Sequence, residues 1–105
     1  MGYIKSMFRV EFADKNLARL EIDPRFTGGY SQPLVRAFRK VMQIIRAAHD
    51  ERDLYAMKSL RFEKLEGDRS SQRSLRLNDQ WRLIVELRGE APVKTLLIVT
   101  IEDYH

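Results

Sequence analysis

The stretch Ser74–Gly89, SLRLNDQWRLIVELRG, alternates apolar and polar residues on both sides of a short polar segment at 78–80. Alternation with a period of two is typical of β-strands. Two such runs joined by a few turn-forming residues predict a β-hairpin. We therefore expect one strand before the segment 78–80, a tight turn within it, and a longer strand after it.

The same alternation predicts which side chains of the hairpin share a face. The apolar positions would point towards the core, namely Leu75, Leu77, Trp81, Leu83 and Val85. Arg76 and Arg82 would then lie side by side on the opposite face. Two facing guanidinium groups are unfavourable unless an anion lies near them. Either Glu63, Asp79 or Glu86 neutralises them, or the pair is a phosphate clamp.

Upstream of the hairpin, the apolar residues follow a helical period. Asp14 is predicted to cap a short helix over 15–22, and Ser31, followed by Pro33, to cap a longer amphipathic helix. The charged segment 49–53 would end or kink this second helix. The helices would supply one apolar layer for the hairpin to pack against.

Three further strands are expected around these elements, at about 7–12, 61–67 and 93–101. The last is the most apolar, which predicts a central position in the sheet. This order predicts an α+β fold in which two N-terminal helices pack on one face of a small antiparallel sheet. The other face of the sheet would be free to carry a site.

Length and composition restrict the possible classes of protein. The 105 residues correspond to a single domain, 1–105, and the chain has no cysteine and a net charge of +4. A small basic domain is attracted to polyanions. No apolar run is long enough for a membrane helix, and no signal peptide is apparent. We therefore expect a cytoplasmic protein without a membrane contact.

The residues that could bind phosphate or transfer protons lie in two segments. Residues 63–73 carry Glu63, Lys64, Arg69 and Arg73 around one glycine, which is typical of a surface turn or of a basic loop beside a nucleic-acid groove. The terminal residues are Asp103, Tyr104 and His105. No metal-ligand spacing, cofactor motif or glycine-rich phosphate loop occurs, so neither a metal nor a cofactor is expected.

The terminal residues allow two interpretations. They are either a solvated tail or a set of acid, base and orienting groups. Together with Arg76 and Arg82, they would suit attack of an RNA 2′-hydroxyl on the adjacent phosphate. That reaction needs proton transfer at both oxygens and cations beside the phosphate.

The segment 60–87, LRFEKLEGDRSSQRSLRLNDQWRLIVEL, together with the terminal EDYH, resembles the HigB branch of the RelE/ParE toxin superfamily. The resemblance is close over 60–105 and general before that. It implies a ribosome-dependent mRNA endonuclease that acts on messenger in the A site. It also implies a HigA-type helix-turn-helix antitoxin, through which the toxin would reach operator DNA.

The resemblance also implies roles for individual residues. Asp103, Tyr104 and His105 match the catalytic terminal motif of the family, and Arg76 and Arg82 match the arginines of its second block. A further group falls where the family places an active-site side chain and basic contacts, namely Glu63, Lys64, Arg69 and Arg73.

Two positions depart from the family pattern. Some members have His where this chain has Glu63, and many have Lys where it has Glu66. Both differences remove potential positive charge from the expected site. Two other functions stay open: a toxin of the same fold that binds DNA gyrase, as ParE-type relatives do, and a non-catalytic module that binds nucleic acid or protein.

Overall fold

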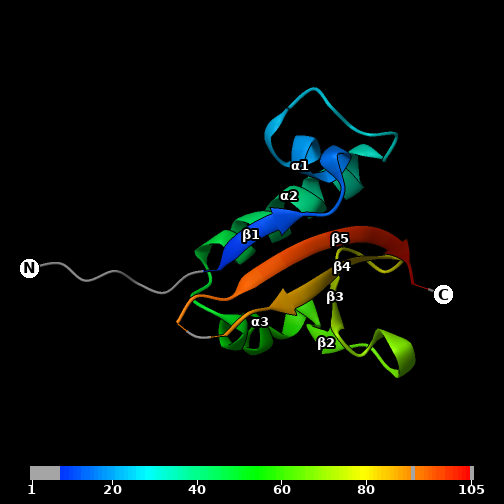
Figure 1. Ribbon diagram of the computed structural model, residues 1–105. Helices are drawn as coiled ribbons and strands as arrows, with labels where there is room; N and C mark the ends of the chain where they lie inside the picture. Colours follow the sequence, from blue (N-terminus) through cyan, green and yellow to red (C-terminus); the bar gives the residue numbers. More distant parts are fainter. Residues whose placement is uncertain (1–7, 91, 105) are drawn as a thin grey trace, which may run out of the picture.

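The computed structural model describes residues 8–90 and 92–104, and Figure 1 shows their arrangement. The elements are, in order, β1 (Arg9–Phe12), α1 (Lys15–Ile22), α2 (Gln32–Ala47), α3 (Glu51–Ala56), the one-turn 3₁₀ helix η1 (Lys58–Leu60), β2 (Glu63–Lys64), a second 3₁₀ turn η2 (Gly67–Arg69), β3 (Gln72–Arg76), β4 (Trp81–Arg88) and β5 (Thr95–Asp103). The predicted α+β class is therefore confirmed. No helix in the described part of the chain is long and apolar enough to cross a membrane.

The sheet is mixed, so the prediction of an antiparallel sheet is wrong for one of its strands. The strand order is β1-β5-β4-β3-β2. Strands β2 to β5 form antiparallel pairs, whereas β1 pairs parallel to β5, with Arg9 opposite Thr95. The helices follow β1 in the chain, and strands β2 to β5 then form three antiparallel pairs. The last of these strands, β5, lies beside β1. Strand β5 is thus an interior strand, and β4 holds the middle position.

The two predicted helix starts are confirmed by their caps. The Asp14 carboxylate accepts a hydrogen bond from the backbone N–H of Asn16 (2.8 Å), and the Ser31 hydroxyl accepts one from that of Leu34 (3.3 Å). Such caps satisfy backbone donors that have no partner within the first helical turn. The sequence therefore determines both starts locally.

A third helix, α3, was not predicted as a separate element. Helix α2 ends at Ala47, and the Asp50 carboxylate then accepts a hydrogen bond from the backbone N–H of Arg52 (2.9 Å), which caps α3. Of the two predictions for segment 49–53, the end of the long helix is the correct one. The same charged residues also begin the next helix.

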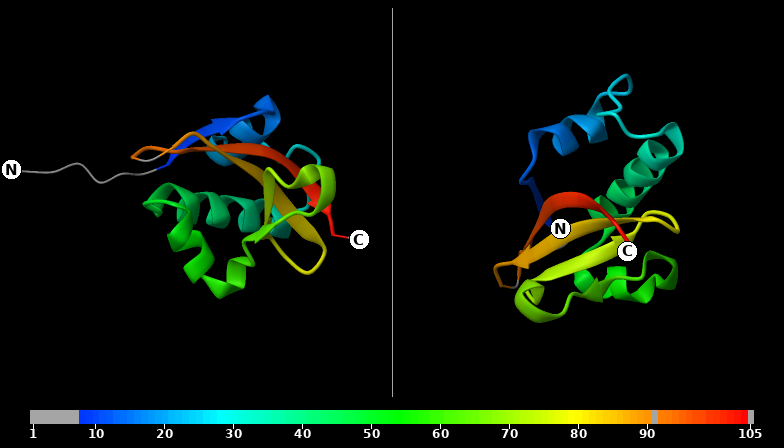
Figure 2. Two further views of the ribbon diagram at one scale, coloured as in Figure 1. Left: turned by 60° about the horizontal axis from the view of Figure 1, so that its bottom comes forward. Right: turned by 90° about the vertical axis from the view of Figure 1, so that its right-hand side faces the viewer.

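One face of the sheet packs against the helices. A single apolar cluster joins Phe38 of α2 and Leu54 of α3 to side chains of β3, β4 and β5, and Figure 2 (left) shows both helices on the same side of the sheet. The sheet residues of this cluster are Leu75, Leu83, Val85, Leu96, Ile98 and Ile101. The core face predicted for the hairpin is confirmed, with Trp81 half-buried at its edge.

A β-bulge in β5 changes which of its residues face the core. In the pairing with β4, Ile84 lies opposite Thr100 but Val85 lies opposite Ile98, which leaves Val99 as an extra residue. Ile98 and Ile101 therefore both reach the core cluster. Beyond the bulge, the even-numbered residues of β5 lie on the other face. We call this second face the open face; it carries Ser74, Arg82, Ile84, Thr100 and Glu102.

Candidate functional site

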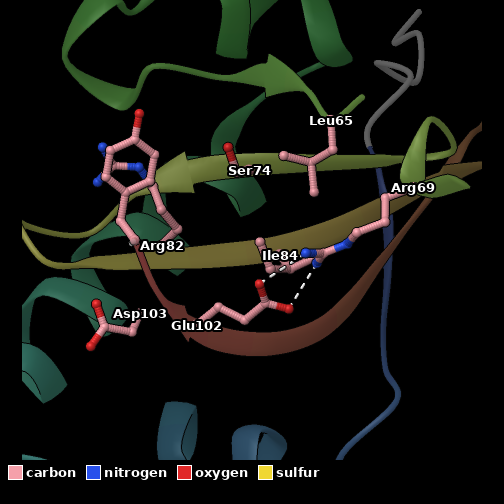
Figure 3. A pocket seen from close by; sticks show the side chains of 8 residues that line it. Leu65, Arg69, Ser74, Arg82, Ile84, Glu102 and Asp103 are labelled. Carbon is pink, nitrogen blue, oxygen red and sulfur yellow. Dashed lines mark hydrogen bonds and ion pairs between the residues drawn. The ribbon is translucent and has the colours of Figure 1, made fainter. Parts of the chain in front are cut away.

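A cavity of about 440 Å³ lies on the open face, near the end of β5 (Figure 3). Strands β3, β4 and β5 form its floor, and the segment from Leu65 to Arg69 forms one wall. Its lining residues are Leu65, Arg69, Ser74, Arg82, Ile84, Glu102, Asp103 and Tyr104. The cavity therefore brings two distant parts of the sequence together, the basic loop and the chain terminus.

Arg82 is the most buried charged residue of this cavity, with 6% of its surface exposed. Its Nη1 donates a hydrogen bond to the carbonyl of Asn78 (2.9 Å), and its Cζ lies 3.8 Å from the centre of the Tyr104 ring. Its Nε is buried without a hydrogen-bond partner, and no carboxylate of the described residues forms an ion pair with it. A buried cation in this state is stabilised strongly by an incoming anion.

Arg69 and Glu102 close the cavity on the side of the basic loop. Two guanidinium nitrogens of Arg69 donate to the two carboxylate oxygens of Glu102, at 2.7 and 3.1 Å (Figure 3). Glu102 also lies opposite Arg82 in the β4–β5 register. Glu102 was not among the predicted site residues. Simple alternation from Leu96 and Ile98 would place it on the core face, whereas the bulge at Val99 places it on the open face.

The predicted neighbourhood of Arg76 and Arg82 is confirmed, because the two residues are register partners in β3 and β4. Their surroundings nevertheless differ. Arg76 forms an ion pair with Asp79 of the hairpin turn, which is one of the three carboxylates predicted to neutralise the arginines. Arg76 does not line the cavity. Arg82 forms no ion pair among the described residues. The two arginines are therefore adjacent but not equivalent.

The terminal segment is attached to the hairpin turn. The backbone N–H of Tyr104 donates to the carbonyl of Gln80 (2.6 Å), and the side-chain amide of Gln80 donates to the Asp103 carboxylate (3.1 Å). Asp103 lies at the rim of the cavity, and its carboxylate points in the opposite direction from that of Glu102 (Figure 3). His105, the proposed main acid or base, lies outside the described residues.

The other predicted contacts are placed away from the cavity. Lys64 and Arg73 are register partners, and Arg73 Nε donates to the Tyr55 hydroxyl (3.3 Å), which lies in α3 on the helix side of the sheet. Glu63 pairs with Ser74 in the register but is exposed. None of Glu63, Lys64 and Arg73 lines the cavity, whereas Arg69 does.

Comparisons with known proteins address the family. The model of the RelE-like toxin HigB of type II toxin–antitoxin systems matches residues 10–105. Among solved structures, a YoeB/ParE toxin from Agrobacterium tumefaciens aligns with a TM-score of 0.54 and 13% identity, over 92% of this chain and 99% of that one. At this identity the likeness concerns the fold. The comparison with curated proteins finds no match.

The family match extends well beyond the segment that carried the resemblance in the sequence. It begins in β1 and includes the helices, the hairpin and the terminal strand that form the cavity. The chain therefore belongs to the HigB-like family of RelE-like toxins of type II toxin–antitoxin systems.

Proposed function

We propose that this toxin is a ribosome-dependent mRNA endonuclease, whose site is the open-face cavity. Arg82 is the observation that carries the proposal. It is a buried guanidinium without a carboxylate partner among the described residues, and Tyr104 of the terminal motif covers it. A phosphate in the cavity would supply the missing anion, and a guanidinium suits the oxygens of a phosphate well.

The proposed reaction is attack of a 2′-hydroxyl oxygen on the adjacent phosphorus. A new bond forms between the 2′-oxygen and phosphorus while the bond to the 5′-oxygen breaks, which leaves a cyclic phosphate and a 5′-hydroxyl. A base takes the proton of the 2′-hydroxyl, and an acid protonates the leaving oxygen. Arg82 would stabilise the charge that grows on the non-bridging oxygens.

The terminal residues would supply the proton transfers. His105 is the proposed main acid or base, Asp103 its partner, and Tyr104 either a positioning group or a second donor. Gln80 supports this arrangement, because it holds both the backbone of Tyr104 and the carboxylate of Asp103. The role of His105 rests on its match to the terminal motif of the family.

The charges in and around the cavity favour a substrate that the ribosome holds in place. Arg69 is engaged by Glu102 and Arg76 by Asp79, so a phosphate would have to compete for both. Glu63 and Glu66 add no positive charge. Arg82 forms no ion pair among the described residues, but it is buried and Tyr104 covers it. Such a site gains much from a substrate that is already positioned, and the ribosome is proposed to supply that positioning.

The partner of a type II toxin is an antitoxin, and we propose that it is a HigA-type helix-turn-helix protein. Such an antitoxin would neutralise the toxin and would connect it to operator DNA. The test is co-expression: we expect the neighbouring open reading frame to encode a small helix-turn-helix protein, which should co-purify with the toxin and should restore growth. Continued growth arrest despite equal expression of both proteins would contradict this assignment.

Mapping of mRNA ends after expression of the toxin tests the endonuclease. New 5′-hydroxyl ends should appear within translated messages and should vanish when translation initiation is blocked. Deletion of Tyr104–His105 should abolish these ends and the growth arrest, while circular dichroism and antitoxin binding persist. Full toxicity of the truncated chain would contradict the mechanism. A DNA-damage response without cleaved mRNA would favour gyrase binding instead.

A further inference from the structure

A second hollow, of about 530 Å³, adjoins the cavity at the hairpin turn. Its lining residues are Lys58, Ser59, Arg61, Arg76, Asp79 and Arg82. Arg82 lines both the cavity and this hollow, so the two lie next to each other at this residue. We call the second hollow the basic groove. It lies between η1 and the end of β3, which contact each other.

The basic groove carries more positive charge than its own residues neutralise. Its lining includes four cationic side chains and one carboxylate, that of Asp79. Asp79 pairs with Arg76 and leaves the other three cations of the groove without this carboxylate; its side chain is 97% exposed at the hairpin turn, so water screens the pair. Within residues 8–90 and 92–104, neither Lys58 nor Arg61 forms an ion pair.

The backbone of η1 brings Lys58 and Arg61 to the same place. The N–H of Arg61 donates to the carbonyl of Lys58 (3.1 Å), which closes the turn at the left-handed end of η1, and both residues line the basic groove. Two like charges that line one groove repel each other unless an anion lies near them. Local geometry therefore concentrates charge in the basic groove.

Arg61 also occupies a left-handed conformation, with φ 46° and ψ 55°. It is the one non-glycine residue at positive φ in the described part of the chain. Glycine is the residue that fits this position without strain, so an arginine here costs stability. Backbone strain of this kind is concentrated at functional sites, where the side chain or its direction is needed.

We propose that the basic groove binds the phosphodiester of the messenger nucleotide next to the scissile one, with Lys58 and Arg61 as its main contacts. Arg82 would then lie between two successive phosphates of one strand. Ser59 adds a hydroxyl that can donate to a phosphate oxygen or accept from a 2′-hydroxyl. This inference rests on the proposed function, because it requires a single RNA strand across the open face.

The experiment measures binding of oligonucleotides that cannot be cleaved because they carry 2′-O-methyl groups. Fluorescence anisotropy is recorded for a dinucleotide, which has one phosphodiester, and a tetranucleotide, which has three. The test variants are Arg61→Asn, which removes the charge and tolerates the left-handed backbone, and Lys58→Gln. The matched control is Arg36→Gln, which removes one charge from the exposed surface of α2.

Arg61→Asn and Lys58→Gln should each weaken binding of the tetranucleotide roughly threefold to tenfold and leave that of the dinucleotide unchanged. Each should also reduce the slope of log affinity against log salt by about 0.7, the value for one phosphate contact on a single strand. Arg36→Gln should change neither. Equal losses for both oligonucleotides, or an equal loss in the control, would overturn the proposal.

A second arm separates messenger from ribosomal RNA, which offers the same phosphodiester chemistry. The variants are tested for binding to ribosomes without messenger. Loss of this binding with unchanged tetranucleotide affinity would overturn the assignment to the messenger strand. Both arms measure binding and not cleavage, so a missing cleavage activity would contradict the endonuclease while length-dependent binding would still support the groove.

Discussion

The two faces of the sheet use the same strands in different ways. On the core face, Leu83 and Val85 are covered by apolar side chains of the helices. On the open face, Arg82 and Ile84 are almost as buried, but the cavity around them is lined by a polar loop and by the terminal residues. Burial on the core face holds the fold. Burial on the open face isolates one charge, so changes there should affect chemistry more than stability.

The largest effect on stability is expected for Phe38→Ala. Phe38 lies in α2 and is fully buried against the core face. Loss of its ring should lower the free energy of unfolding by about 3–5 kcal/mol, because transfer and cavity terms add. Urea denaturation measures the change, and Arg36→Gln on the same helix should stay within about 0.5 kcal/mol. A change below about 1 kcal/mol for Phe38→Ala would contradict the claim that burial on the core face holds the fold.

Arg82→Gln should have the largest effect on activity. Removal of the cation beside the phosphate should lower mRNA cleavage by about 10²- to 10³-fold, the loss typical when one group that stabilises the transition state is removed. Stability should change little, since the variant also removes the cost of a buried charge. Primer extension on ribosome-bound messenger gives the cleavage rate, and thermal unfolding reports the stability.

Arg76→Gln is the matched control, because Arg76 is the register partner of Arg82 but already has Asp79 as its counter-ion. Its effect on cleavage should be at most about tenfold. If the two variants lose the same activity, the arginines act as one clamp, and the distinction between the ion-paired Arg76 and the buried Arg82 has no functional meaning.

Tyr104 allows the role of its ring to be separated from that of its hydroxyl. Tyr104→Leu removes the ring over Arg82 and should lose about 0.5–2 kcal/mol of interaction, up to roughly thirtyfold in cleavage. Tyr104→Phe keeps the ring and should retain most activity. Single-turnover cleavage compares the two variants. Equal losses would assign the effect to the hydroxyl as a proton donor.

The smallest effect is expected for the ion pair that joins the open face to the basic loop. Arg69 and Glu102 are both partly exposed, at 46% and 39% of their side chains. Their coupling should therefore be about 0.2–1 kcal/mol in unfolding, despite the two-fold hydrogen bonding. A double-mutant cycle with Arg69→Gln and Glu102→Gln measures it. A coupling above about 2 kcal/mol would mean that this pair is part of the core.

Local signals were sufficient for much of the fold. The caps at Asp14 and Ser31 and the hairpin around 78–80 depend on neighbouring residues, and their positions follow from the sequence. The parallel pairing of β1 with β5 does not follow from the sequence, because no local pattern indicates which strands will be neighbours in the sheet. For α3, the charges of segment 49–53 fit both an end and a kink.

The candidate site shows the same division between local and distant information. The adjacency of Arg76 and Arg82 follows from a short turn and is confirmed. The position of Glu102 depends on the bulge at Val99, and a bulge is a property of strand pairing rather than of one strand. The contact between Arg73 and Tyr55 joins β3 to α3, so it could not be read from the basic composition of the loop.

The position of β5 between β1 and β4 has a consequence for the order of folding. Strand β4 precedes β5 by a short loop, whereas Arg9 and Thr95, which are register partners in β1 and β5, are 86 positions apart (95 − 9). Closing so long a loop is entropically costly, and pairings of this kind slow folding. We expect the β3–β4–β5 meander to form early and β1 to join it late. An early intermediate would then already hold the terminal segment beside the hairpin turn, while one side of β5 is still unpaired.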